Sequence, residues 1–243
     1  MGIKFELIKF TNFADDIIKG RIYMNPLEYY RGIERILNGD IDNNRNSAIN
    51  DYIEGSIGNI HKNDLEKIGL DFPKEVKDAL IGGVQLLSEN LKYLKIFSLY
   101  MFIYDDKCVA VHPNKKLLEF GANKAVIIKN FDEFKKRFAR ALKQKQQEKG
   151  LLSCCAHPID YYDSLSEYRK LEPFNKDIHF WWQHEFRIIV EEKTSNLNPL
   201  VIEIGDISDI AVCVEAKTLI ESPALIYPQY SFIMEEENKN RRI

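Results

Sequence analysis

The stretch that decides the fold lies late in the chain, at residues 176–192, and has the sequence KDIHFWWQHEFRIIVEE. It contains both tryptophans of the chain and two of its five histidines. From Glu185 onward polar and apolar residues alternate, which predicts a β-strand because successive side chains of a strand point to opposite faces. The even-numbered positions up to Val190 are all apolar, and Glu185 and Arg187 would share the opposite face.

The pair formed by Glu185 and Arg187 allows two interpretations. A carboxylate beside a guanidinium, close to large aromatic residues, is what a site for a planar, phosphate-bearing ligand requires. The same residues are also typical of a surface ion pair beside a core aromatic residue. Both interpretations remain open at the level of the sequence.

Length and composition predict one folded domain over residues 1–243. The chain is 45% hydrophobic, 12% aromatic and 29% charged, so it can bury a sizeable core and remain in water. The formal net charge of −3 provides no general basic field that would attract nucleic acid, so such a contact would need a local patch. The four cysteines form no C-x-x-C motif, which favours a reduced, cytoplasmic setting.

The beginning of the chain lacks the apolar run of a signal peptide. The longest apolar stretch, at residues 96–104, is far too short to cross a bilayer. We therefore expect no contact with a membrane.

Hydrophobic periodicity predicts an α+β fold with a split, mixed or antiparallel β-sheet flanked by helices. A first strand at residues 5–10 is followed by a short helix that Thr11 or Asn12 would cap and Gly20 would end. Residues 62–93 have helical spacing, so a helical insert over about residues 56–94 is expected, and the charged tail over about residues 235–243 should be frayed. Further strands are predicted at residues 21–24, 95–104, 107–112, 124–129, 152–162, 200–204 and 210–214.

A helix is predicted from residue 131 to Gly150, with Asn130 and Glu133 as a capping-box pair. Its inner face would bury phenylalanines, and its outer face is basic. A solvated helix face explains those charges, and a nucleic-acid patch is the alternative, although no aromatic residues interleave with the charges. The basic residues are Lys135, Lys136, Arg140, Lys143 and Lys145.

Several classes of site are excluded by missing residues. His184-Glu185 begins like a zinc-protease helix, but Ile188 stands where the second histidine belongs. No P-loop, G-x-G-x-x-G or G-x-S-x-G motif occurs. Asp40, Asp42 and Asn44 have the spacing of the first three ligands of a calcium-binding loop. Arg45 stands where that loop requires glycine, so we predict a surface loop rather than a metal site.

Several short motifs together resemble a bacterial and phage family of unknown function. They fall between about residues 5 and 192. They comprise an aromatic segment, an acidic segment and a closing pattern in which a lysine and an aromatic residue precede Gln-x-Glu-[Tyr/Phe]-Arg. In this chain they are GRIYMNPLEYYR from Gly20, DYIEG from Asp51, IFS ending at Ser98, FNK ending at Lys176 and WQHEFR ending at Arg187.

That family in turn resembles the ADP-ribosyltransferase fold, in which a split sheet binds NAD. The resemblance implies that Glu185 is the late-strand acid, Tyr23 the second-strand aromatic residue and Ser98 a serine in the sheet core. The first strand offers no His or Arg where that fold places one, which is a departure from the pattern.

The chemistry of such a site can be stated physically. Cleavage of the bond between nicotinamide and ribose develops positive charge on the sugar, which a carboxylate stabilises. Glu185 would be that catalytic acid, and basic side chains would bind the pyrophosphate. Trp181 or Trp182 could stack on the nicotinamide or adenine ring. The expected NAD-binding or nucleotide-binding cleft comprises Tyr23, Arg31, Glu54, Ser98, Lys176, Trp182 and Arg187 around Glu185.

A second hypothesis is a non-enzymatic phage or mobile-element binding protein that inhibits a host protein or sequesters a nucleotide signal. The missing first-strand His or Arg favours it. The aromatic and acidic segment at residues 29–54 favours it as well, because aromatic and arginine residues dominate protein interfaces. A third interpretation is a nucleic-acid-binding factor that uses the basic helix.

Overall fold

The chain forms two compact units in the computed structural model, which describes residues 4–30, 54–80, 83–104, 113–149, 151–193 and 197–221. Unit 1 comprises residues 1–22, 99–141 and 202–243, and unit 2 comprises residues 23–98 and 142–201. The strands β2 (Arg21–Pro26) and β5 (Leu94–Tyr104) contribute residues to both units. The expectation of one domain over the whole chain stays a prediction.

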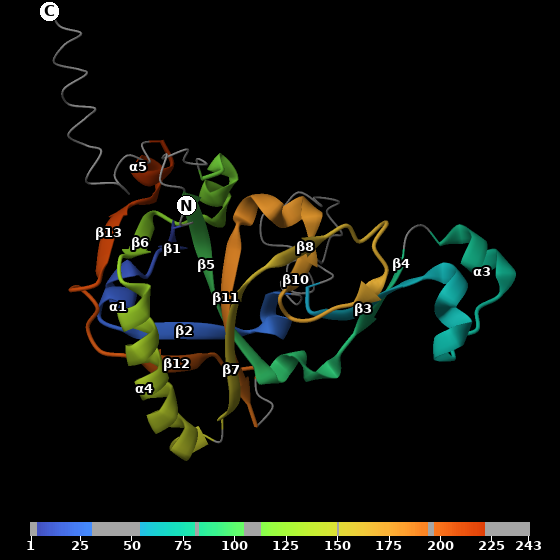
Figure 1. Ribbon diagram of the computed structural model, residues 1–243, viewed down its shortest axis with the longest axis horizontal. Helices are drawn as coiled ribbons and strands as arrows, with labels where there is room; N and C mark the ends of the chain where they lie inside the picture. The colour runs from blue at the N-terminus through green and yellow to red at the C-terminus, as the bar shows by residue number, and fades with distance from the viewer. Residues whose placement is uncertain are drawn as a thin grey trace, which may run out of the picture. The chain divides into compact units, whose positions relative to one another are not determined.

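The main β-sheet has eight antiparallel strands, and the α+β class is confirmed. Its order is β12-β2-β5-β1-β6-β13, and β11 pairs with both β5 and β7 (Figure 1). The remaining strands of this sheet are β1 (Lys4–Thr11), β6 (Lys124–Ile128), β7 (Leu151–Pro158), β11 (Glu185–Glu192), β12 (Leu200–Glu203) and β13 (Ala211–Glu215).

Most strands predicted from periodicity are confirmed to within two residues. The strand predicted at residues 152–162 is instead divided into β7 and β8 (Asp160–Tyr162). The division follows Pro158, because proline cannot donate a hydrogen bond to a β-ladder. The strand predicted at residues 107–112, the acidic loop at residues 38–51 and the tail at residues 235–243 lie outside the described residues.

Unit 1 has a β1-centred core. Leu7 in β1 lies opposite Met101 on one side and Ile128 on the other, and neither Leu7 nor Ile8 is exposed to solvent. Both faces of β1 are therefore covered, as expected for a central strand.

The turn after helix α1 (Ala14–Ile18) depends on a glycine. Gly20 has φ +84°, and a Cβ atom there would lie 1.8 Å from the carbonyl oxygen of Gly205. Gly20 therefore ends the helix, as predicted, and also allows a close backbone approach. The predicted helix cap is wrong: Phe13 is the N-cap without a side-chain bond, while the Thr11 hydroxyl accepts from the Phe13 N–H.

Helix α4 (Phe131–Lys149) begins at the predicted residue, and the Asn130 side chain accepts from the Glu133 N–H at 3.0 Å. The second bond of a capping box is not made, because the Asn130 N–H donates to the Ile210 carbonyl oxygen at 3.4 Å. The Glu133 carboxylate binds Arg137 Nε at 3.0 Å. Phe134 and Phe138 are buried. The other helices of unit 1 are η3 (Lys115–Phe120) and α5 (Ala216–Glu221).

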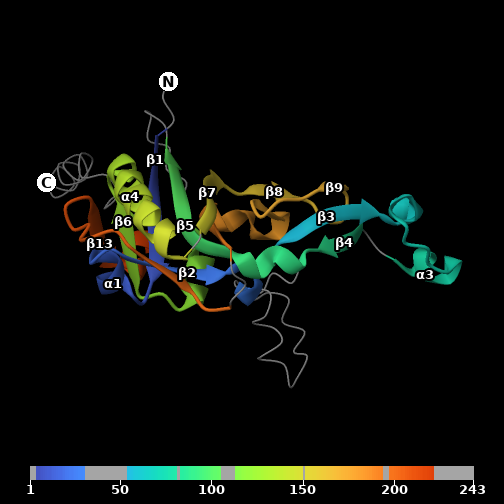
Figure 2. The same cartoon turned by 90° about the horizontal axis from the view of Figure 1, so that it is seen from below.

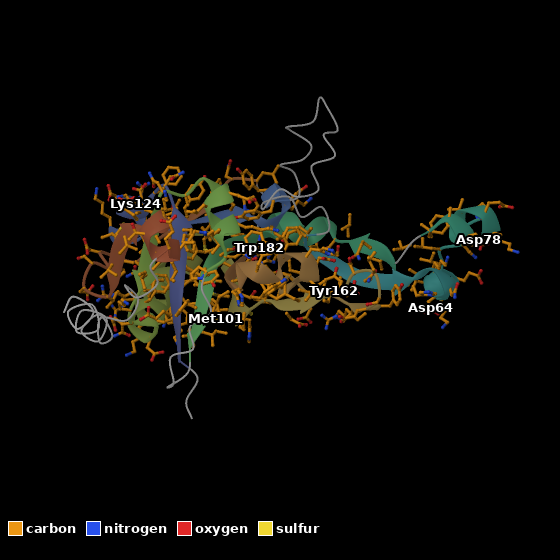
Figure 3. The ribbon with its side chains drawn as sticks, turned by 90° about the horizontal axis from the view of Figure 1, so that it is seen from above. Asp64, Asp78, Met101, Lys124, Tyr162 and Trp182 are labelled. Carbon is orange, nitrogen blue, oxygen red and sulfur yellow. The ribbon has the colours of Figure 1, made fainter. Side chains whose placement is uncertain are left out.

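The segment predicted as a helical insert contains helices, but it also contains a β-hairpin that was not predicted (Figure 2). Pro73 and the pair Gly82-Gly83 interrupt residues 62–93, and glycine and proline are the poorest helix formers. Two short helices carry Asp64 and Asp78 between the hairpin strands (Figure 3). The elements are β3 (Ser56–His61), η1 (Lys62–Ile68), α3 (Lys74–Ala79), β4 (Gly83–Leu87), η2 (Glu89–Tyr93) and β9 (Arg169–Lys170), which pairs with β3.

A short parallel pair leads into β11 within unit 2. Strand β10 (Asn175–Asp177) pairs with β8, and helix η4 (Ile178–Gln183) follows directly. Asp177 caps η4 by accepting from the His179 N–H at 2.9 Å. Residues 176–192 therefore form the end of one strand, a 3₁₀-helix and a second strand in succession.

Two further findings concern the described residues only. None of their helices is long and apolar enough to cross a membrane. Cys154, Cys155 and Cys213 are free thiols.

Candidate functional site

Five of the predicted site residues come together inside unit 2. Glu54 precedes β3, Ser98 lies in β5, Lys176 lies in β10, and both Glu185 and Arg187 lie in β11. We call Glu54, Lys176, Glu185 and Arg187 the buried ion cluster. Glu185 and Arg187 lie on the same face of β11 because successive side chains of a strand point to opposite faces.

Arg187 is the centre of the buried ion cluster. Its Nε and Nη2 atoms donate to the two carboxylate oxygens of Glu185 at 2.6 and 3.2 Å. Its Nη1 and Nη2 atoms donate to the two oxygens of Glu54 at 2.7 and 2.9 Å, and Nη1 also donates to the carbonyl oxygen of Pro173 at 2.6 Å. A guanidinium has five N–H donors, so all of them are used within unit 2.

Lys176 joins the same two carboxylates. Its Nζ atom lies 3.3 Å from Glu54 Oε2 and 3.3 Å from Glu185 Oε2. It also donates to the Gln183 side-chain oxygen at 2.9 Å and lies 5.0 Å from the centre of the Phe180 ring. The cluster therefore contains two carboxylates and two cations, and its formal charges cancel.

Glu185 accepts four hydrogen bonds. Besides the two from Arg187 and the one from Lys176, its Oε1 atom accepts from the Ser98 hydroxyl at 2.6 Å. A carboxylate has about four acceptor positions, so these are filled. Burial alone would raise the pKa of Glu185, but the charges of Arg187 and Lys176 and the hydrogen bonds from Arg187 and Ser98 hold it well below its usual range.

Burial distinguishes this cluster from both interpretations of the sequence. Glu54, Glu185 and Arg187 are 3%, 7% and 2% exposed, and Lys176 is 9% exposed. The expectation of a surface ion pair is therefore wrong. Arg187 also has no unused N–H donor for a pyrophosphate, because Glu54 occupies its outer edge.

Two tyrosines line the cluster and were not predicted as site residues. The Tyr161 hydroxyl accepts from the Glu185 backbone N–H at 2.9 Å, and burial raises the pKa of Tyr161 to about 12. Burial likewise raises the pKa of Tyr30 to about 12. Tyr30 also packs on an apolar cluster that includes Ile189, which shares a face of β11 with Arg187. No motif in the sequence pointed to Tyr161 of β8. Gln183, which accepts a hydrogen bond from Lys176, belongs to the Gln-x-Glu pattern quoted above.

The remaining predicted residues differ widely in exposure to solvent. Tyr23 is 56% exposed, and Trp182 is 6% exposed on η4 (Figure 3). Trp181, the alternative ring for stacking, is 53% exposed. Arg31 lies outside the described residues.

The residue between η4 and β11 has an unusual backbone. His184 has φ +40° and ψ +49°, and among the described residues it alone combines a positive φ with a side chain other than hydrogen. A non-glycine residue in this left-handed region is strained and persists only where its surroundings hold it. The His184 ring meets the Trp181 ring edge-on at 5.7 Å, and burial lowers the pKa of His184.

Two other predicted features can be compared with the structure. Within the described ranges, no group of three or more His, Cys, Asp or Glu residues could hold a metal ion. On α4, Lys136, Arg140 and Lys143 are exposed as expected, while Lys135 pairs with Asp132 at 2.8 Å. Nucleic-acid binding by this helix stays a prediction.

Comparison of the chain with protein-family models, with curated proteins and with solved structures found no match.

Proposed function

We propose that this chain is a binding protein for another protein and that Ile178 and Trp181 form its central contact. These two residues, which we call the η4 platform, are 41% and 53% exposed. In a 3₁₀-helix residues i and i+3 eclipse one another, so both side chains lie on the same side of η4. An exposed tryptophan on a fixed backbone is the residue type that most often dominates a protein interface.

The buried ion cluster supports this role because it fixes the helix that carries the platform. Lys176 precedes η4 and donates to Gln183 at the end of η4, so one hydrogen bond spans the helix. Asp177 caps the same helix, and Trp182 is buried beside Trp181. A platform that is already ordered loses less conformational entropy when a partner binds.

The test is capture of a protein partner from a lysate by immobilised protein. Trp181→Ala should lose the captured protein, because it removes the largest exposed ring of the platform. Tyr23→Ala is the matched control, since Tyr23 is an aromatic residue of similar exposure outside the platform. Equal capture by both variants would contradict the proposal.

A second candidate is an ADP-ribosyltransferase-like protein that binds NAD, and one observation favours it. Ser98 and Glu185, the sheet serine and late-strand acid of that resemblance, are joined by a 2.6 Å hydrogen bond. In this candidate Glu185 stabilises positive charge on the ribose. Lys176 and Arg187 would keep Glu185 ionised and oriented, and the exposed Trp181 ring would stack on a base in place of the buried Trp182.

Charge balance makes this second candidate the weaker one. The four acceptor positions of Glu185 are filled, and the two nearby cations cancel the field of the two carboxylates. The described part of β1, residues 4–11, contains no His or Arg. A substrate would have to displace an existing partner of Glu185 before contacting it.

The enzyme candidate is tested by measuring nicotinamide release from NAD, with and without lysate proteins as acceptors. Glu185→Gln should abolish release. The matched control is Glu192→Gln, which alters another buried glutamate of β11 whose partner, Lys95, lies at 3.4 Å. Absence of release by the unaltered protein would reject this candidate and leave the η4 platform hypothesis intact.

A further inference from the structure

Among the described residues, two complementary polar atoms in the three-stranded sheet of unit 2 have no hydrogen-bond partner. Asn59 in β3 and Arg169 in β9 lie directly opposite each other. Residues opposite each other in an antiparallel pair project from the same face, with Cβ atoms about 4.5–5.5 Å apart. The buried acceptor Asn59 Oδ1 and the buried donor Arg169 Nε are both unpaired. A buried unpaired group of this kind costs about 1–3 kcal/mol, so native proteins rarely leave one without a partner.

The Asn59 amide cannot be turned to remove the problem. Its Nδ2 atom donates to the carbonyl oxygens of Ser164 and Glu167 at 2.8 and 2.6 Å. Exchanging the amide oxygen and nitrogen would place an oxygen against two carbonyl oxygens. Because Asn59 is 1% exposed, its Oδ1 atom is also shielded from bulk water.

The Arg169 guanidinium is held in place as well. Its Nη2 atom donates to Asp160 Oδ2 at 2.8 Å, and its central carbon lies 5.5 Å from the centre of the Tyr162 ring. Rotation of Nε toward a new partner would weaken both contacts. The Glu167 Oε2 atom lies 3.8 Å from Nε, which is too long for a direct hydrogen bond.

We propose that Asn59 Oδ1, Arg169 Nε and Glu167 Oε2 bind one internal water molecule. The water oxygen accepts from Arg169 Nε, and its two hydrogens are donated to Asn59 Oδ1 and Glu167 Oε2. Buried waters in proteins make about three hydrogen bonds, and water commonly bridges polar atoms that lie just beyond direct contact. This arrangement gives each unpaired atom a partner of the correct type.

The bound water would connect the turn at residues 163–168 to β3 and β9. Glu167 already stabilises this turn, because its Oε1 atom accepts from the Asp163 N–H at 3.0 Å. The Ser164 and Glu167 carbonyl oxygens are tied to Asn59. The water adds a link between the Glu167 carboxylate and the same asparagine.

A crystal structure at a resolution that reveals ordered water tests the site. In the unaltered protein we expect density within hydrogen-bonding distance of both Asn59 Oδ1 and Arg169 Nε. Arg169→Lys keeps a positive charge for Asp160 but has no donor at the Nε position, so the density should disappear. Asp160→Asn is the matched control, because it removes the charge of the ion pair and leaves all three water-binding atoms, so the density should remain.

A measurement in solution gives an independent outcome. A water held at this site transfers magnetisation to the Asn59 side-chain amide protons, and that transfer should be lost in Arg169→Lys and retained in Asp160→Asn. Absence of both density and magnetisation transfer in the unaltered protein would overturn the proposal. Density that persists unchanged in Arg169→Lys would overturn it too.

Discussion

Two arginines, one in each unit, bind nearly the same set of groups in very different surroundings. In unit 1, Arg137 binds the Glu133 carboxylate, both oxygens of Asp209 and the carbonyl oxygen of Asp206. In unit 2, Arg187 binds two carboxylates and one carbonyl oxygen in the same manner. The side chain of Arg137 is 19% exposed and that of Asp209 57% exposed, whereas the side chains of Arg187 and Glu54 are each 2% exposed.

Burial, rather than the number of hydrogen bonds, decides how much each arginine contributes to stability. Water and salt reach the partly exposed Arg137 and its exposed partner Asp209 and screen them, so these ion pairs add little to stability. In the buried ion cluster neither carboxylate can be solvated if its partner is removed. The buried arginine should therefore contribute much to the stability of unit 2, while the partly exposed one is a modest addition to unit 1.

Arg187→Met should have the largest effect of any substitution in the cluster. It leaves Glu54 and Glu185 buried with Lys176 as their shared cation, and breaking a buried ion pair costs about 3–5 kcal/mol. Urea unfolding followed by far-ultraviolet circular dichroism measures the loss. Arg187→Lys keeps a positive charge but lacks the planar guanidinium. Its free energy of unfolding should therefore lie between those of Arg187→Met and the unaltered protein. A loss no larger than that caused by Arg137→Met would refute the comparison.

Lys176→Met and Glu54→Gln should be strongly non-additive. Each variant alone leaves one unbalanced charge in the cluster, whereas the double variant again contains one cation and one carboxylate. We expect a coupling free energy of about 0.5–3 kcal/mol in a double-mutant cycle measured by urea unfolding. Additive free energies would mean that the four groups do not act as one unit.

The secondary structure and the site can be predicted from the sequence only where the interacting residues lie close together along the chain. Strands β5, β6 and β11 follow from local runs of β-branched and aromatic residues, although β6 and β11 are buried at nearly every position rather than at alternate ones. The β3–β4 hairpin does not, because its glycines and proline leave segments too short for either period to stand out. A local pattern therefore predicts an element only when the element is long.

The site shows the same dependence. Lys176, Glu185 and Arg187 lie within one short stretch and could be proposed together. Glu54 and Ser98 entered only through short motifs, and Glu54 lies 133 residues before the arginine that it binds. No pattern within residues 176–192 shows that the distant Glu54 carboxylate binds the Arg187 guanidinium, so burial of the cluster could not be predicted.

Lowering the pH should remove the contribution of the Glu185 carboxylate to the free energy of unfolding. Its folded-state pKa lies below the unfolded value of about 4.3, so the unfolded state binds a proton first as the pH falls. Its contribution is fully present near pH 7 and declines from about pH 5 downward. The difference in unfolding free energy between the unaltered protein and Glu185→Gln should therefore narrow between about pH 7 and pH 3. A difference that stays constant over this range would contradict the assignment of Glu185 as an ionised, stabilised group.

Ser98→Ala should have a smaller effect, because it removes one hydrogen bond and leaves all four charges in place. A hydrogen bond to a charged group contributes about 1.5–3 kcal/mol, and Ser98 is half-buried, so we expect a loss near the lower end. Thermal unfolding of Ser98→Ala and Ser98→Thr compares loss and retention of the hydroxyl. Equal destabilisation by both would show that packing rather than the hydrogen bond to Glu185 matters.

Arg137→Met should have the smallest effect, although it breaks as many kinds of contact as Arg187→Met. Glu133 and Asp209 are exposed enough to be solvated once the guanidinium is gone, and the methionine chain can still cover the helix surface. Raising the salt concentration should reduce even this difference, since added ions screen the exposed pairs. The same salt series should leave the effect of Arg187→Met unchanged, because mobile ions cannot enter a cluster that excludes solvent. If salt weakened both effects equally, the two arginines would have to be regarded as equally accessible, and the contrast between them would fail.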